Sequence, residues 1–218
     1  MRIVIAGGHG KIALLLERLL AERGDQAVAL IRNPAQAGDV QQAGADAVVC
    51  DLETATTGDV AALLAGADAV VFAAGAGPGS GASRKDSVDR AASVLMAEAA
   101  EQAGVRRFIQ ISAMGAGQPP QPGRDDVWAA YITAKTAAEE DLLDRPLHWT
   151  ILRPGGLTDA PATGRVRLAA PRIPGGTIPR ADVAAVIVAL LDEPGTRHQI
   201  LELVGGDTPV AEAVHSIS

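Results

Sequence analysis

The sequence predicts an α/β protein in which helices cover both faces of a doubly wound, mainly parallel sheet. Short apolar runs rich in Val and Ile alternate with longer runs of helical periodicity along almost the whole chain of 218 residues. Residues 44–49 and 66–71 both read Gly-Ala-Asp-Ala-Val-Val, a glycine helix stop followed by a buried strand. A glycine-rich stretch, residues 7–10, separates the first strand from the first helix. These patterns favour parallel strands joined by right-handed crossovers.

Seven segments have the length and composition of strands. They are residues 2–6, 27–31, 47–50, 69–73, 108–112, 149–152 and 199–203. Right-handed crossovers place the first six in the order 3-2-1-4-5-6, and the seventh can extend the sheet.

Helical periodicity marks the segments between these strands. In the first of them Ile12, Leu16 and Leu20 recur on one face, and Gly24 is suited to end the helix. We expect helices over residues 11–23, 36–43, 59–64, 82–103, 126–143 and 181–191, and one short helix in the C-terminal tail. Residues 154–180 hold many prolines and glycines and little periodicity. We expect a substrate loop or small lid there, within one domain that spans residues 1–218.

Composition limits the classes to which the protein can belong. Apolar residues make up 48% of the chain, enough for a sizeable core, and the formal net charge of −7 argues against nucleic acid as the main partner. The one cysteine, Cys50, excludes an internal disulfide, and we expect it to be a small core residue in a reducing compartment. The sequence contains no apolar stretch of membrane-spanning length and no recognisable signal peptide, so we expect a cytoplasmic protein without a membrane partner.

The glycine-rich stretch has the context of a dinucleotide-binding loop, because it follows a strand and opens a helix. Gly7 suits the tight turn, and Gly10 lets the backbone approach a pyrophosphate, which then meets the free N–H groups of the helix. Ile12 stands where a P-loop requires Ser or Thr. A tight turn without a ligand is the alternative. The expected cofactor contacts of this loop are Gly7, Gly8, His9, Gly10, Lys11 and Ile12.

The residue that follows the second strand bears on the choice between NAD and NADP. An acidic residue there binds the ribose 2′-hydroxyl, whereas an arginine accommodates a 2′-phosphate. Arg32 occupies this position, with Asn33 beside it, so we expect NADP(H) in preference to NAD(H); a solvated loop charge is the alternative for Arg32. The ends of the third and fourth strands should also reach the cofactor. The residues expected there are Asp51, Leu52, Ala73, Ala74 and Gly75.

Tyr131 and Lys135 form a Y-x-x-x-K motif on a predicted helix. This spacing places both side chains on one face, where the ammonium is expected to lower the pKa of the phenol. Such a tyrosine can exchange a proton with a substrate oxygen while a hydride moves to or from a nicotinamide. Ser112, at the end of the fifth strand, can hydrogen-bond the same oxygen. The alternative is a core tyrosine beside a surface lysine.

Taken together, these segments resemble the atypical short-chain dehydrogenases/reductases, in the NAD(P)-binding, NmrA-like group that is often called NAD-dependent epimerase/dehydratase. The matching segments are residues 5–13, 31–34, 51–52, 88–89, 104–112, 131–139 and 149–159, and the most specific is Leu152-Arg153-Pro154-Gly155. The resemblance implies a Rossmann fold. It also implies that Pro154 and Gly155 lie against the nicotinamide.

The resemblance further assigns the family's catalytic Ser, Tyr and Lys to Ser112, Tyr131 and Lys135, of which Lys135 also holds the cofactor ribose. Asp89 takes the place of the usual asparagine, as in this subgroup; the alternative is a helix-surface acid beside Arg90.

Three further residues are ambiguous. Trp128 either walls the substrate pocket or is a half-buried helix residue. Arg84 and Lys85 either reach a phosphate or lie on a solvated helix face. In each case the second reading is favoured.

The expected function is that of an NADP-dependent oxidoreductase, with hydride transfer between NADPH and a small carbonyl, quinone-like or similar molecule. One alternative is a redox sensor that binds NADP(H) and a protein partner without turnover. Another is a sugar epimerase or dehydratase, for which few residues follow the sixth strand. No metal site is expected, because the four histidines lack metal-ligand spacing. Monomer and homodimer both stay open.

Overall fold

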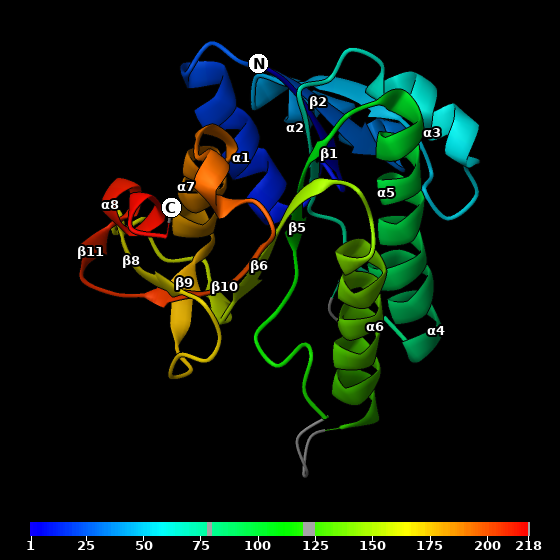
Figure 1. The fold of residues 1–218 in the computed structure, drawn as a ribbon. Coiled ribbons are helices and arrows are strands. Elements are labelled where there is room, and N and C mark those ends of the chain that lie inside the picture. Colours follow the sequence, from blue (N-terminus) through cyan, green and yellow to red (C-terminus); the bar gives the residue numbers. More distant parts are fainter. Residues whose placement is uncertain (78–79, 120–124, 218) are drawn as a thin grey trace.

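The computed structural model describes residues 1–77, 80–119 and 125–217 (Figure 1). Within these residues the main sheet has the order β11-β8-β10-β6-β5-β4-β1-β2-β3. Its strands are β1 (Arg2–Ala6), β2 (Gln26–Ile31), β3 (Asp46–Val49), β4 (Ala69–Phe72), β5 (Arg107–Ile111), β6 (His148–Pro154), β8 (Arg165–Ala169), β10 (Gln199–Gly205) and β11 (Thr208–Pro209). The predicted order 3-2-1-4-5-6 is confirmed, and the seventh predicted strand is β10, which adds parallel to β6.

Helices cover both faces of this sheet, as expected for a doubly wound fold (Figure 1). One face carries α1 (Lys11–Glu22), α2 (Ala37–Gln42), α7 (Arg180–Asp192) and α8 (Val210–His215). The other face carries α3 (Thr57–Leu64), α5 (Ala92–Ala103) and α6 (Asp126–Leu143). None of the helices in the described residues is long and apolar enough to cross a bilayer.

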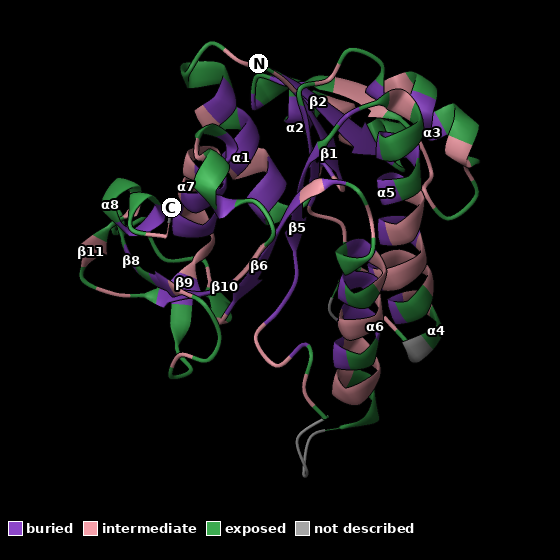
Figure 2. Cartoon of the chain, in the orientation of Figure 1, coloured by how far each residue is buried: buried purple, intermediate pink, exposed green. Residues whose placement is uncertain are grey.

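The period of two along the strands divides the core between these layers. In β1, Ile3 and Ile5 pack with α1 and α7, whereas Val4 and Ala6 pack with α3 and α5. The strands are therefore buried on both faces, which Figure 2 shows as a purple sheet between helices whose outer sides are green.

The predicted helix over residues 82–103 is divided into three parts. A short α4 (Ala82–Arg84) leads into a π-helical segment, η2 (Lys85–Ala91), and then into α5. Two of the side chains that η2 buries are charged, Lys85 and Asp89. Segments of this kind often occur at functional sites.

The structure differs from the expected irregular loop at residues 154–180. β7 (Gly156–Thr158) and β9 (Thr177–Pro179) pair into a small separate sheet, and β8 joins the main sheet antiparallel to β10. In β8 the buried residues Val166 and Leu168 alternate with the exposed Arg165 and Arg167. This period of two is only five residues long and lies among turn residues, which explains why it was missed.

The two edges of the main sheet are unlike each other. At one edge β3 pairs with β2 and leaves Val49 55% exposed. At the other edge β11 has only two residues, Thr208 and Pro209, and pairs antiparallel with β8.

Among the residues that the structure describes, one core carboxyl group has no hydrogen-bond partner on either oxygen. Glu17, on the inner face of α1, is fully buried, and neither of its carboxylate oxygens has a hydrogen-bond partner among the described residues. Burial raises the pKa of this carboxyl to about 8, although the neighbouring Arg18 lowers it somewhat. The folded protein therefore holds a proton at Glu17 that the unfolded chain releases near pH 4.5.

We expect this group to make the free energy of unfolding fall as the pH rises from 4.5 to about 8, because the folded state binds the extra proton in that window. The slope should approach about 1.4 kcal/mol per pH unit. Glu17→Gln should abolish this slope in urea unfolding measured across the window. Glu22→Gln, at an exposed site on the same helix, is the matched control and should keep it. A slope that persists in Glu17→Gln would assign it to other groups.

Candidate functional site

The loop between β1 and α1 is shaped by its glycines. Gly7 has a φ of +75°, and a Cβ there would lie 2.6 Å from the Cα of Ala74; a Cβ on Gly8 would lie 2.4 Å from the Cβ of Ala29. Gly10 caps α1 without a side-chain hydrogen bond, and the first turn contains no acidic residue. The N-terminus of α1 thus begins at Gly10, which lines the cavity described next, and no acidic side chain of its first turn opposes the pyrophosphate of a dinucleotide.

A cavity of about 250 Å³ lies beside this loop, at the carboxyl ends of β1, β2, β3 and β4. It brings together most of the residues expected to contact the cofactor. Those that line it are Gly7, His9, Gly10, Arg32, Asp51, Leu52, Ala73, Ala74 and Gly75. Cys50 lines it as well; this residue is half-buried and packs against the core.

Seven residues expected to contact the cofactor do not line this cavity. Of these, Pro154 and Gly155 line the larger cavity described below, and Lys135 is buried. Gly8 packs on β2, and Ile12 belongs to the core. Asn33 accepts a hydrogen bond from the N–H of Ala35 and so caps a short helical turn. Lys11 pairs with Asp159 at 2.5 Å, on the segment that follows β7.

Two arginines meet at the rim of the cofactor cavity. Arg32 and Arg84 lie 3.1 Å and 2.9 Å from the same carboxylate oxygen of Glu53, whose other oxygen accepts a hydrogen bond from Ser87 at 2.6 Å. The Ser87 hydrogen bond, with Arg84 and Arg32, lowers the pKa of Glu53. Sequence reasoning favoured a solvated face for Arg84 and overlooked Glu53, because the elements that carry them meet only in the folded chain.

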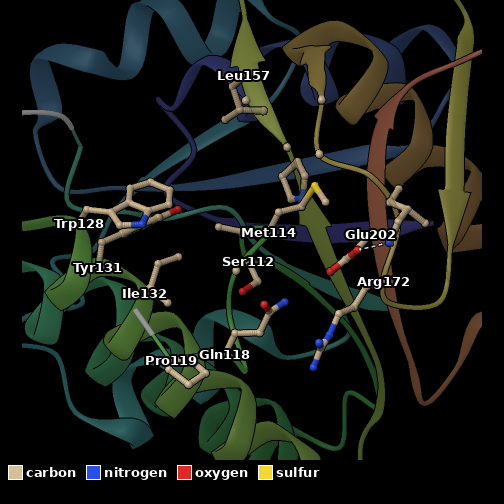
Figure 3. Close-up of a pocket in the computed structure, with 18 of the residues that line it drawn as sticks. Ser112, Met114, Gln118, Pro119, Trp128, Tyr131, Ile132, Leu157, Arg172 and Glu202 are labelled. Atoms are coloured by element: carbon tan, nitrogen blue, oxygen red, sulfur yellow. Dashed lines mark hydrogen bonds between the residues drawn. The ribbon is translucent and has the colours of Figure 1, made fainter. Parts of the chain in front are cut away.

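A larger cavity, of about 790 Å³, lies beyond the carboxyl ends of β5 and β6 (Figure 3). It is bounded by residues 112–119, by α6, by the segment after β6 and by β10. Its side chains include Ser112, Met114, Gln118, Trp128, Tyr131, Ile132, Leu157, Arg172, Arg180 and Glu202, and Pro154 and Gly155 also line it. Trp128 lines the cavity and is also half-buried, so the structure agrees with both interpretations of this residue, as a wall of the pocket and as a half-buried helix residue.

Tyr131 lies among charged and aromatic groups. The ring centroid is 5.6 Å from that of Trp128, 5.0 Å from the ammonium nitrogen of Lys85 and 5.8 Å from that of Lys135. Lys85 and Lys135 are both buried, so neither is the surface lysine of the alternative readings. The motif therefore brings its two side chains to one site, as its spacing predicts.

The expected lowering of the tyrosine pKa is wrong for this structure. Burial raises the pKa of Tyr131, and the charge of Asp89 raises it further. The ammonium of Lys135 lies 3.2 Å from a carboxylate oxygen of Asp89 and donates a hydrogen bond to the carbonyl of Ile111. Its charge is therefore largely compensated by Asp89, and Tyr131 stays protonated at neutral pH.

Asp89 is an interior residue and not a helix-surface acid. It is 1% exposed, and one carboxylate oxygen accepts a hydrogen bond from the N–H of Ala76 at 3.2 Å. Arg90 pairs instead with Asp86. Asp89 thus joins Lys135 to the chain that follows β4.

Ser112 belongs to a buried network that sequence reasoning missed. Its hydroxyl donates a hydrogen bond to Glu139, which also pairs with the guanidinium of Arg153. All three residues are at most 7% exposed. Glu139 and Arg153 both fall in segments that carry the family resemblance, but that they pair across α6 and β6 could not be read from spacing.

A family model described as NAD(P)H-binding matches residues 7–194. The chain belongs to this NAD(P)H-binding family. A nicotinamide dinucleotide is accordingly its cofactor class, in agreement with the glycine loop and the cleft beside it.

Three relatives show what this chain is similar to. An uncharacterised sugar epimerase of Bacillus subtilis is 36% identical over the full length of both chains. The structure of a putative NAD-dependent epimerase/dehydratase from Bacillus halodurans is 35% identical, with a TM-score of 0.91 and 99% of each chain covered. That of ChuY, an anaerobillin reductase from Escherichia coli, is 28% identical, with a TM-score of 0.78 and coverage of 95% of this chain and 98% of that one.

The pKa of Tyr131 can be tested directly, because this residue is the sole tyrosine of the chain. Asp89→Asn removes the negative charge that raises the pKa and leaves the ammonium of Lys135 uncompensated. The pKa of Tyr131 should then fall by at least about one pH unit in an ultraviolet titration of the phenolate. Asp86→Asn, at an exposed site nearby, should leave it unchanged. An unchanged titration in Asp89→Asn would show that burial alone sets this pKa.

Proposed function

We propose that the protein is an NADPH-dependent reductase that delivers a hydride to a conjugated, quinone-like or carbonyl acceptor. The proposal rests chiefly on one arrangement: a dinucleotide cleft and a large cavity containing Tyr131 lie at the carboxyl ends of neighbouring strands in one sheet. Ligands of open α/β sheets bind at this edge.

Tyr131 is the proton donor in this proposal. A nicotinamide held in the cofactor cleft would supply the hydride, and the Tyr131 hydroxyl supplies the proton to the oxygen of the acceptor. The ammonium group of Lys85, 5.0 Å from the ring centroid, stabilises the phenolate left behind until solvent reprotonates it, whereas the charge of Lys135 is largely compensated by Asp89. A phenol with a raised pKa is present in the protonated form that this step requires.

Preference for NADPH is supported by the rim of the cofactor cleft. Arg32 and Arg84 present two guanidinium groups there, and Glu53 holds them together before any ligand binds. A 2′-phosphate can pair with such groups through charge-assisted hydrogen bonds.

The size and walls of the larger cavity favour a conjugated acceptor over the smallest carbonyls. A volume of about 790 Å³ lies in the range of cavities that hold drug-sized ligands. Met114, Trp128, Ile132 and Leu157 provide apolar and aromatic surface. The name of the Escherichia coli relative, an anaerobillin reductase, supports reduction as the reaction.

Sugar epimerisation is the second candidate, because the Bacillus subtilis relative is named a sugar epimerase. Epimerisation through a keto intermediate begins with loss of a proton from an alcohol, so the tyrosine must act first as a base. The raised pKa of Tyr131 disfavours this direction. Reduction is therefore the reaction that the site supports better.

Replacing Tyr131 tests the mechanism. Purified protein should oxidise NADPH in the presence of at least one member of a panel of quinones, flavins and aldehydes. Tyr131→Phe should reduce kcat by about a hundredfold or more, because it removes the proton donor. Thr133→Ala, at an exposed site on the same helix, should retain full activity.

Three outcomes of that assay would change the proposal. Full activity in Tyr131→Phe would exclude the tyrosine mechanism. Absence of turnover with every acceptor, together with tight NADPH binding, would favour a redox sensor. Interconversion of nucleotide sugars without net NADPH oxidation would favour the epimerase.

Arg32→Ala tests the preference for NADPH. Loss of one guanidinium from the rim should weaken NADPH binding about tenfold and NADH binding far less, as measured by calorimetry. Arg18→Ala, at an exposed position of α1, should affect neither cofactor. Equal weakening of both cofactors by Arg32→Ala would contradict a role for Arg32 at the 2′-phosphate.

A further inference from the structure

A buried carboxylate, that of Glu202, lies in the wall of the larger cavity, and nothing in the proposed chemistry uses it. Glu202 is in β10, where Leu201 and Leu203 on either side of it face the core. Its side chain is 1% exposed and projects from the opposite face of the strand into the cavity (Figure 3).

One of the two carboxylate oxygens of Glu202 has a hydrogen-bond partner in the protein. One oxygen, Oε2, accepts a hydrogen bond from the N–H of Ile173 at 2.8 Å, drawn as the dashed line in Figure 3. The other oxygen, Oε1, has no hydrogen-bond partner among the described residues. Unlike the carboxylate oxygens of Glu17, it is not completely enclosed by protein atoms. It therefore has access to the cavity and is free to accept a hydrogen bond there.

The cationic groups nearest along the chain are not paired with Glu202. Arg153, its register partner on β6, pairs with Glu139. Arg172 makes no ion pair with any described residue, and Arg180 pairs with Asp159. Since a buried carboxylate is costly unless its oxygens are hydrogen-bonded, an open Oε1 calls for a donor from outside the chain.

The hydroxyl of Ser112 is a second group in the cavity that can accept a hydrogen bond from a ligand. Ser112 donates its only hydroxyl proton to Glu139, so its oxygen offers lone pairs to the cavity. In the view of Figure 3, Ser112 lies between Tyr131 on one side and Glu202 on the other. The cavity thus has a proton donor at the Tyr131 end and acceptors from its centre to the Glu202 end.

We infer that Glu202 is a specificity-determining residue, which selects acceptors that carry an N–H or O–H donor at the end remote from the carbonyl reduced beside Tyr131. This inference rests on the proposed reductase function and narrows its substrate class. Conjugated molecules with an amino, hydroxyl or pyrrole-type N–H group satisfy it, whereas purely apolar quinones leave Oε1 without a partner. A donor to a charged carboxylate contributes more than one between neutral groups.

The alternative is that Glu202 only anchors residues 172–176 through Ile173. Glu202→Gln separates the two roles, because the amide oxygen can still accept from Ile173 while the NH₂ group now faces the cavity. Glu140→Gln, at an exposed site on α6, is the matched control for loss of one negative charge.

The test compares menadione with its 6-amino derivative, in which the amino group is on the benzo ring, at the end remote from the quinone carbonyls. Affinities of both quinones for the NADP⁺-loaded protein are measured by quenching of the tryptophan fluorescence, and turnover with NADPH is measured separately. Wild-type protein and Glu140→Gln should bind the amino compound about tenfold more tightly than menadione. Glu202→Gln should lose this preference while keeping its melting temperature and its affinity for menadione.

The outcomes separate this inference from the proposed function. No preference in the wild type, or an equal preference in Glu202→Gln, would overturn the role of Glu202 whatever the turnover. A preference that depends on Glu202 without reduction of either quinone would support the recognition site and count against the reductase. Because the wild-type comparison needs no variant, a poorly folded Glu202→Gln would still leave the inference open to refutation.

Discussion

Parallel pairing of β3, β2, β1, β4, β5 and β6 is the constraint on which the rest of the structure depends. Parallel strands end at the same edge, so every segment that follows a strand must turn there before it enters a helix. The glycine loop, the Arg32–Glu53 pair, the chain beside Asp89 and the loop that carries Ser112 come from distant parts of the sequence, yet they share this edge. The site is thus a consequence of strand direction before it is a consequence of any one residue.

Charge balance in the interior sets the chemistry at this edge. Lys135 and Asp89 form one compensated pair, and Arg153 and Glu139 form another. Removing one member of such a pair leaves a buried charge alone, which typically costs several kcal/mol. The same pairing explains why the ammonium beside Tyr131 does not draw the phenol toward ionisation. In the second pair, Glu139 also accepts the hydroxyl proton of Ser112, so the serine can act toward the cavity only as a hydrogen-bond acceptor.

Much of the fold could be predicted from sequence, because the periodicity of buried strands and amphipathic helices is a local property. Strand β1 and helix α6 agree with their predicted bounds, and the strand order followed from crossover handedness. β8 was missed because its alternation is short and lies among prolines and glycines.

The candidate site was predictable where a motif fixed it and not where tertiary packing did. The spacing of Tyr131 and Lys135 placed both side chains at one site. The partners that decide their behaviour, above all the pairing of Lys135 with Asp89, lie in other elements. Glu202 carries no motif at all: in the sequence it is one polar residue in an apolar run, and only the packing of residues 172–176 against β10 reveals an oxygen left open.

The unlike edges of the sheet have a consequence for assembly. At the β11 edge the strand is only two residues long, and Pro209 has no N–H to offer, so this edge is a poor template for strand addition by another chain. The β3 edge has four residues and no proline, with Val49 open to solvent. Unwanted sheet extension is therefore blocked at one end of the molecule by strand length and proline, and protection at the other end depends on the charge of Asp46 and the shortness of β3.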